Sequence, residues 1–202
     1  MTNDAPDHRD RILDTAAEQV RPFGEAKTNV VDIAKAMGLS QSAIYRHFRS
    51  KADIFDALAA RTMADEAELA TRFVIADGSA SDRLRGLALA LHRSKCAKLG
   101  DDPEIHGLYR RIVTERPDLV ADYARRMTEL VRHVLADGVA RGEFHILDLD
   151  AAAGVVRDAV TVFVHPAHVD QAVVAGLDME PRLQAVMDAL AVAFVAIRPC
   201  DR

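Results

Sequence analysis

The sequence predicts an all-α protein, and three observations support this fold class. Half of the 202 residues are hydrophobic, alanine is abundant, and glycine and proline are modest, with ten and seven residues. Residues that favour helices dominate, whereas alternating runs of β-branched residues, which would indicate strands, are few. Apolar residues recur instead at spacings of three and four, as in amphipathic helices. We expect about nine helices, in an N-terminal three-helix domain over residues 1–51 and a C-terminal helical bundle over residues 52–202.

The first predicted helix runs from residue 7 to residue 23. One face of it is apolar and holds Ile12, Leu13, Ala16, Ala17 and Val20. The sequence Pro22-Phe23-Gly24 is expected to end this helix, because proline disfavours a helix interior and glycine is common just after a helix. Basic residues near its start, among them His8 and Arg9, could touch DNA phosphates or simply form a solvated helix end.

Residues 28–51 are predicted to form two short helices joined by a tight turn, followed by the start of another helix. Thr28 is expected to cap the first helix, because its hydroxyl can accept a bond from a free backbone N–H. Gly38 supplies the left-handed conformation that ends it, and Ser40 caps a second helix over 41–48. The inward residues are Val30, Ile33, Ala34, Met37, Ile44 and Phe48. This layout predicts a helix-turn-helix, whose second helix enters the major groove of DNA.

The outward face of the second helix is suited to DNA. It holds Gln41, Ser42, Ala43, Tyr45, Arg46 and His47. Small side chains at its start allow close approach to phosphate, which the helix N-terminus attracts. Between residues 41 and 51 there are three basic residues and no acidic one. A helical hairpin with a merely solvated face is the alternative, but the glycine turn, the capping residues and the acid-free face together favour DNA binding.

The same stretch resembles the DNA-binding domain of the tetracycline-repressor-like (TetR) family of bacterial regulators. The matching residues, at the family's spacings, are Thr28, Asp32, Ile33, Ala34, Gly38, Leu39, Ser40, Ile44, Tyr45, His47, Phe48 and Lys51. Ser42 departs from the glycine that is frequent there, and it keeps a small side chain. The match of individual residues is specific over residues 9–60. Beyond them, only the chain length and the order of helices resemble the family.

The resemblance and the outward face together give a set of expected DNA contacts. We expect Gln41, Ser42 and Arg46 to read base edges, with Ala43 allowing close approach. The expected contacts with the phosphate backbone are Thr28, Tyr45, His47 and Lys51.

The C-terminal region is predicted to contain a succession of helices. Expected spans are 52–75, 82–99, 103–114, 117–141, 149–164 and 180–197, and Gly142 is expected to cap the fourth of them. In the family, the helix that matches 52–75 links the DNA-binding head to the body and acts as a rigid lever.

The last two predicted helices carry more apolar residues than one buried stripe requires. Helices that are apolar on two sides usually have a second partner to cover them. In the family, the last two helices pair with their copies across a two-fold axis. We therefore expect a homodimer through 149–164 and 180–197, which would present two heads to a near-palindromic operator.

The resemblance also implies that the body binds a small-molecule effector, whose identity the sequence does not indicate. Candidate lining residues are Met63, His92, Tyr109, Tyr123, Met127 and Phe163. Such residues at helical spacing are also what the core of any helical bundle requires. Two other possibilities are a metal held by His165 and His168, and redox sensing by Cys96, but neither has supporting motif spacing. No metal and no cofactor are expected.

The distribution of charge and the absence of certain motifs make several classes of function less probable. Residues 1–51 carry eight Lys or Arg against seven Asp or Glu, whereas 52–202 carry eighteen against twenty-four, so positive charge is local to one end. No nucleophile elbow, phosphate loop or H-E-x-x-H motif indicates an enzyme. No apolar run of membrane-spanning length and no signal peptide are present, so a cytoplasmic protein is expected.

We therefore expect a homodimeric DNA-binding regulator that a small molecule releases from DNA. A repressor is the favoured interpretation, although an activator cannot be separated from it by sequence. The alternative of another class is a small-molecule-binding or catalytic helical body whose head has become a pure protein-interaction module.

Overall fold

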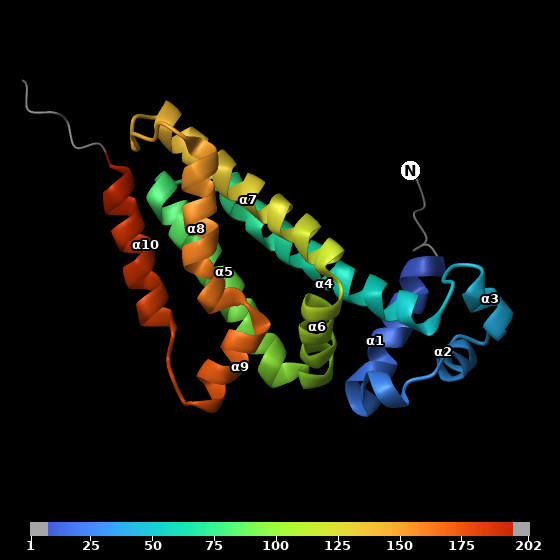
Figure 1. The fold of residues 1–202 in the computed structure, drawn as a ribbon. Helices are drawn as coiled ribbons and strands as arrows, with labels where there is room; N and C mark the ends of the chain where they lie inside the picture. The colour runs from blue at the N-terminus through green and yellow to red at the C-terminus, as the bar shows by residue number, and fades with distance from the viewer. Residues whose placement is uncertain (1–7, 196–202) are drawn as a thin grey trace, which may run out of the picture. The chain divides into compact units, whose positions relative to one another are not determined.

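The computed structural model describes residues 8–195, and over this range the regular structure is entirely helical (Figure 1). This confirms the predicted fold class. The ten helices are α1 (His8–Lys27), α2 (Val30–Ala36), α3 (Gln41–Tyr45), α4 (Lys51–Val74), α5 (Ala80–Asp101), α6 (Pro103–Glu115), α7 (Pro117–Ala140), α8 (Leu149–Val164), α9 (Pro166–Val174) and α10 (Glu180–Phe194). None of these helices is long and apolar enough to cross a lipid bilayer.

The chain divides into two compact units. The first contains the described residues up to Met63 together with Lys98–Leu119, and the second contains Ala64–Ala97 together with the described residues from Val120 onward. Helices α4, α5 and α7 therefore contribute residues to both units.

The first unit is built on the predicted apolar face of α1. All five residues of that face are buried, and they share the interior with Val30, Ile33 and Ala34 of α2 and with Ile44 of α3. The predicted end of the first helix coincides with a real break: Gly24, directly after Pro22 and Phe23, interrupts α1 with a φ of +73°. One further turn, which was not predicted, carries α1 on to Lys27. Glycine suits this break because other residues rarely adopt its positive φ, and an added Cβ would also displace the flexible carboxylate of Glu104 in α6.

Two ion pairs connect α1 with α6 and with the residue before it; the first is bidentate, and in the second a single N–H is shared by two oxygens. The Arg111 guanidinium donates to both carboxylate oxygens of Glu25 at 2.8 Å. Nε of Arg21 lies 2.9 and 3.1 Å from the two carboxylate oxygens of Asp102, the residue before α6. Bidentate contacts fix direction as well as distance. The end of α1 and the start of α6 are therefore held in a defined register.

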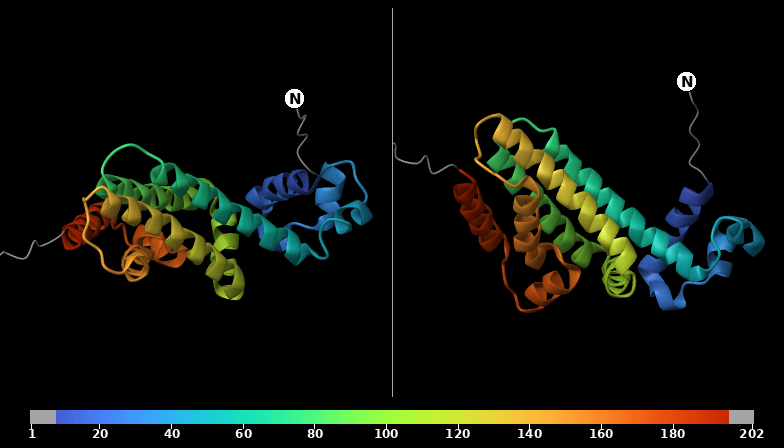
Figure 2. Two further views of the ribbon diagram at one scale, coloured as in Figure 1. Left: turned by 90° about the horizontal axis from the view of Figure 1, so that it is seen from above. Right: turned by 45° about the horizontal axis from the view of Figure 1, so that its top comes forward.

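The second unit has a core shared by α5, α7, α8 and α10. Val134, Leu135, Ala153 and Leu183 are almost wholly buried there. Figure 2 shows from two further sides that α8 and α10 run next to each other, as their contacts require. Gly138 of α7 permits close packing, because an added Cβ would lie 2.4 Å from the ring of Phe144.

A buried arginine donates hydrogen bonds to the last carbonyls of α4. The guanidinium of Arg83 donates to the carbonyl of Phe73 at 3.0 Å and also to that of Val74. The last carbonyls of a helix have no partner within it, so this side chain supplies one. Arg83 also bonds the carboxylate of Asp137, and this contact lowers the pKa of Asp137.

One predicted span differs from the structure, one helix was not predicted, and the end of another predicted span lies outside the described residues. The second helix of the helix-turn-helix ends at Tyr45, and a turn containing Arg46 and His47 takes the place of its predicted last residues. Helix α9 was not predicted; Pro166 occupies its first turn, where a missing N–H costs nothing, and its nine residues show no strong periodicity. Residues 196 and 197 of the last predicted helix lie outside the described range.

The turn between α2 and α3 has the expected glycine. Gly38 adopts a φ of +65°, and the amide of Leu39 donates to the carbonyl of Ala34 at 2.8 Å. The amide of Gly38 donates to the carbonyl of Lys35 at 3.1 Å, which completes a Schellman motif. The motif closes α2 and directs the chain into α3.

Replacing Gly38 by alanine should therefore destabilise the first unit by about 1–2 kcal/mol, because a Cβ disfavours the left-handed conformation. No atom lies within 4 Å of the added Cβ, so the cost arises from the backbone alone. Gly38→Asn should cost less, because asparagine tolerates this conformation. Urea unfolding followed by circular dichroism measures both variants.

Gly107→Ala is the matched control. Gly107 lies inside α6 and its added Cβ also meets nothing within 4 Å, so alanine should be neutral or stabilising by up to about 1 kcal/mol. A Gly38→Ala variant as stable as the parent would contradict the assigned turn.

Candidate nucleic-acid interface

Two anchors hold α3 and the turn after it against the first unit. Ile44 is fully buried and Phe48 is 4% exposed, as predicted. The hydroxyl oxygen of Ser40 accepts a hydrogen bond from the amide of Ala43 at 3.3 Å, which confirms the predicted cap of α3. The Ser40 and Ser42 hydroxyl oxygens lie 2.8 Å apart and share a further bond. The orientation of α3 is thus fixed by burial on one side and by capping at its start.

The predicted DNA contacts of α3 lie on the opposite side. Gln41, Ser42, Tyr45, Arg46 and His47 are exposed, and Ala43 is partly buried. The ring of Tyr45 is large and apolar, yet 47% of the residue is exposed. An exposed aromatic hydroxyl beside an arginine and a histidine offers donors that phosphate oxygens can accept. The structure thus brings six of the eight predicted contacts together on α3 and the turn that follows it.

Lys51 begins α4 and is partly buried. Its ammonium lies 3.5 Å from the carbonyl oxygen of Ala26 and 5.5 Å from the centre of the Phe55 ring. The stem of the side chain is thus packed while the charge remains at the edge of the unit. Asp53 accepts a bond from the amide of Arg49 at 3.0 Å, which fixes the turn that leads into α4.

The start of α1 adds two basic residues beside this surface. The ring centres of His8 and His47 are 6.1 Å apart, and the Arg9 guanidinium lies 4.9 Å from the centre of the Phe48 ring. Sequence reasoning left the role of His8 and Arg9 open. We use the name recognition surface for Gln41, Ser42, Tyr45, Arg46 and His47 together with His8 and Arg9.

Thr28 does not cap α2, contrary to prediction. The N-cap of α2 is Asn29, whose side chain makes no capping bond. Thr28 is 2% exposed, and its hydroxyl donates to the carbonyl of Gly24 at 2.8 Å. Threonines in helices commonly donate to the carbonyl four residues earlier, as Thr62 and Thr71 also do, so Thr28 closes the last turn of α1 instead. Its role as a phosphate contact stays a prediction.

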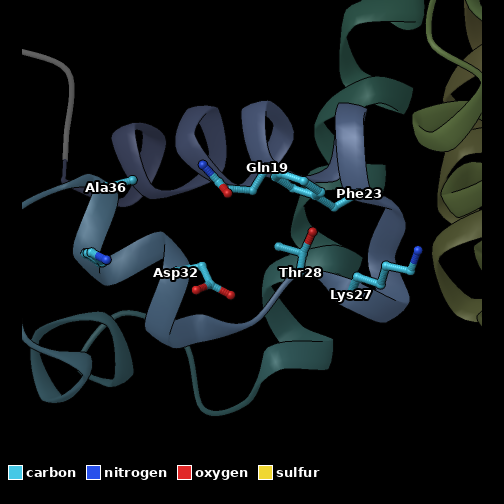
Figure 3. Close-up of a pocket in the computed structure, with 7 residues that line it drawn as sticks. Gln19, Phe23, Lys27, Thr28, Asp32 and Ala36 are labelled. Atoms are coloured by element: carbon cyan, nitrogen blue, oxygen red, sulfur yellow. The ribbon is translucent and has the colours of Figure 1, made fainter.

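Thr28 lies in a groove of the first unit, between α1 and α2. Figure 3 shows Gln19 and Phe23 of α1 on one side of this groove, and Thr28 and Asp32 on the other. The groove is lined by apolar, polar and charged side chains, since Lys27 and Lys35 line it as well.

The predicted effector-lining residues fall in both units. Met63 and Tyr109 are buried in the first unit, and His92, Met127 and Phe163 are buried in the second. His92 and Phe163 do meet, because Nδ1 of His92 lies 2.8 Å from the Phe163 carbonyl oxygen. Tyr123 is half-buried, and Met127 packs in a cluster that Tyr123 flanks.

Sequence reasoning missed a buried ion pair in the second unit. The Lys95 ammonium lies 2.7 and 2.6 Å from the carboxylate oxygens of Glu66, and both residues are 1% exposed. The hydroxyl of Tyr123 donates to the same carboxylate at 3.0 Å. Buried charges are tolerated when they are paired and bonded in this way. No signal in the sequence shows that these two residues, 29 positions apart, would meet inside the unit.

Two family models match most of the chain. Residues 12–58 match the model of bacterial regulatory proteins of the tetR family. Residues 80–190, which are more than half of the chain, match the tetracyclin repressor-like C-terminal domain.

Two known proteins are similar in sequence to parts of this chain. The nucleoid occlusion factor SlmA of Marinobacter nauticus is 38% identical over 58 residues, 29% of this chain and 30% of that protein. The regulator TcmR of Streptomyces glaucescens is 33% identical over 127 residues, 60% of this chain and 54% of that protein. The chain thus aligns with less than two thirds of the length of either relative.

Two solved structures share the fold. FadR from Bacillus subtilis, in complex with stearoyl-CoA, has a TM-score of 0.62 and 20% identity over 90% of this chain and 96% of that chain. A TetR-family regulator from Pectobacterium atrosepticum has a TM-score of 0.67 and 19% identity over 98% and 99%. With its helix-turn-helix, its exposed recognition surface and its matched C-terminal domain, this chain belongs to the TetR family of DNA-binding transcriptional regulators.

Proposed function

We propose that the protein is a homodimeric repressor that binds a near-palindromic operator and leaves it when a small molecule binds. DNA binding is assigned to residues 1–51, and effector binding and dimerisation to residues 52–202. The observation that carries the proposal is the acid-free recognition surface on α3, whose position is fixed by the buried side chains of Ile44 and Phe48.

Base reading is assigned to the first turn of α3 and to the arginine that follows the helix. Gln41 offers a donor and an acceptor for an adenine edge, and Arg46 offers the paired donors that guanine accepts. Tyr45, His47 and Lys51 are assigned to the phosphate backbone, and Ala43 leaves room for the duplex to approach. His8 and Arg9 extend the same positive surface from α1.

Dimerisation is assigned to the outer faces of α8 and α10. Valines on these helices and at the residue after α10 are exposed in the single chain: Val155, Val162, Val192 and Val195. Exposed alanines, including Ala185 and Ala189, lie among them on α10 and would let two helices approach closely. An exposed apolar face of this extent favours a second copy as its cover. A two-fold axis would then give two recognition surfaces, which suits a near-palindrome.

Release by an effector requires that the effector bind the released state more tightly than the DNA-bound state. The ion pairs of Arg111 with Glu25 and of Arg21 with Asp102 offer a route for this coupling inside the first unit. A displacement of α6 would be passed to α1 through them. Because α1 carries His8 and Arg9 at its other end, such a displacement would alter the recognition surface.

Lys51→Ala should weaken binding about equally on all duplex sequences, because Lys51 is assigned to the phosphate backbone. The slope of log affinity against log salt should fall by roughly one. Fluorescence anisotropy with a random-sequence duplex, repeated over a range of salt concentrations, measures this slope.

Arg126→Ala is the charge-matched control, since Arg126 is exposed on α7 in the second unit. This variant should leave the affinity for DNA and the slope of log affinity against log salt unchanged. A Lys51→Ala variant with an unaltered slope, or one that loses affinity for some sequences only, would refute the phosphate assignment.

Val192→Glu should convert the dimer to a monomer, because it places a charge in an apolar interface. Val192 is 75% exposed in the single chain, so the fold of the chain itself should be retained. Sedimentation equilibrium gives the mass, circular dichroism gives the helix content, and binding to a palindromic duplex should weaken at least tenfold.

Val174→Glu is the matched control, because Val174 is 89% exposed but lies at the end of α9. This variant should remain dimeric. If Val192→Glu also sediments as a dimer, the interface lies elsewhere.

A further inference from the structure

A small cavity in the second unit brings together donor groups that the proposed function does not use. It has a volume of about 90 Å³ and lies between α5, the end of α8 and α9. His92, Cys96, His168 and Asp178 are among the residues that line it. A cavity of this size has room for a small ion or a few water molecules.

The imidazole of His92 is held with one nitrogen facing Cys96. The residue is 6% exposed, and its Nδ1 lies 2.8 Å from the carbonyl oxygen of Phe163. A carbonyl can only accept, so Nδ1 carries the proton and Nε2 carries a free lone pair. Histidines that bind metals are typically oriented in this way, with the other ring nitrogen donating to a carbonyl or carboxylate.

The thiol of Cys96 lies one helical turn further along α5. Its Sγ is 3.7 Å from Nε2 of His92. Burial raises the pKa of the Cys96 thiol, and the nearby carboxylates of Glu180 and Asp178 raise it further. The free protein therefore carries a neutral thiol, which is a poor nucleophile toward oxidants and electrophiles. A metal ion can still bind it by displacing the proton.

The separation of the two donor atoms fits one shared ion. In a three-coordinate site, bonds of about 2.3 Å to sulfur and about 2.0–2.1 Å to nitrogen subtend about 120° and place the donors about 3.8 Å apart. The described residues hold no preformed group of three His, Cys, Asp or Glu side chains for a metal. The choice of ion follows from the donors alone: a soft thiolate selects Cu(I), and imidazole suits copper as well.

We propose that His92 and Cys96 bind a soft monovalent metal ion, Cu(I), in this cavity. Binding breaks the S–H bond, forms bonds from the metal to Sγ and to Nε2, and releases one proton to solvent without any change of oxidation state. A third donor would come from His168, which lines the same cavity, after its side chain changes rotamer. The site is separate from the recognition surface, so its test does not depend on DNA binding.

The test is an anaerobic titration of the full-length, reduced protein with Cu(I), in competition with the chromophoric chelator bicinchoninate. The chain has two cysteines, and Cys200 lies outside the described residues, so Cys200→Ser serves as the parent. The parent should bind one equivalent. Adding Cys96→Ser should abolish binding, and adding His92→Gln should weaken it about 10- to 100-fold.

His133→Gln, made in the same parent, is the matched control, because His133 is exposed on α7. It should leave Cu(I) affinity unchanged. X-ray absorption of the loaded parent gives a readout that does not depend on how the variants fold, and it should show both sulfur and imidazole nitrogen at the metal. No uptake by the parent, or sulfur ligation alone, would overturn the proposal.

Discussion

The burial of Ile44 and Phe48 is the constraint on which the DNA-binding surface depends. Helix α3 has five residues, far fewer than a helix needs to be stable by itself in water. Its geometry is therefore imposed by these two anchors, by the Ser40 cap and by the left-handed conformation of Gly38. With one side fixed in the interior, the polar residues between the anchors must face outward, and their identity then decides what the surface binds.

Polar groups inside the second unit obey a related constraint. A buried charge is costly unless it is paired, and Glu66, Arg83 and Lys95, the charged residues found buried in the described part of this unit, each have a partner. Arg83 bonds the last carbonyls of α4, and Lys95 bonds Glu66 together with Tyr123. These hydrogen bonds connect helices α4, α5 and α7 and have defined directions. The apolar side chains around them can pack in more than one orientation. His92 and Cys96 form a smaller polar pair in the same unit.

Periodicity and turn residues predicted the local structure well, because both act over a few residues. The apolar face of α1, the cap at Ser40 and the cap at Gly142, with its φ of +72°, could all be recognised in the sequence. Contacts between distant segments could not. Two local predictions also failed: Thr28 has the residue type of a cap but closes the last turn of α1 instead, and α9 is short with weak periodicity. The Glu66–Lys95 pair and the His92–Phe163 bond depend on packing between helices.

The central claim is that paired recognition surfaces read a symmetric DNA site. Selection of bound duplexes from a random pool, with the full-length protein at physiological salt, tests this claim most directly. The proposed function predicts enrichment of a near-palindrome whose half-sites have centres about one helical turn, 10–10.5 base pairs, or a multiple of it, apart. Recovery of unrelated duplexes, or of a single half-site without a symmetric partner, would contradict it.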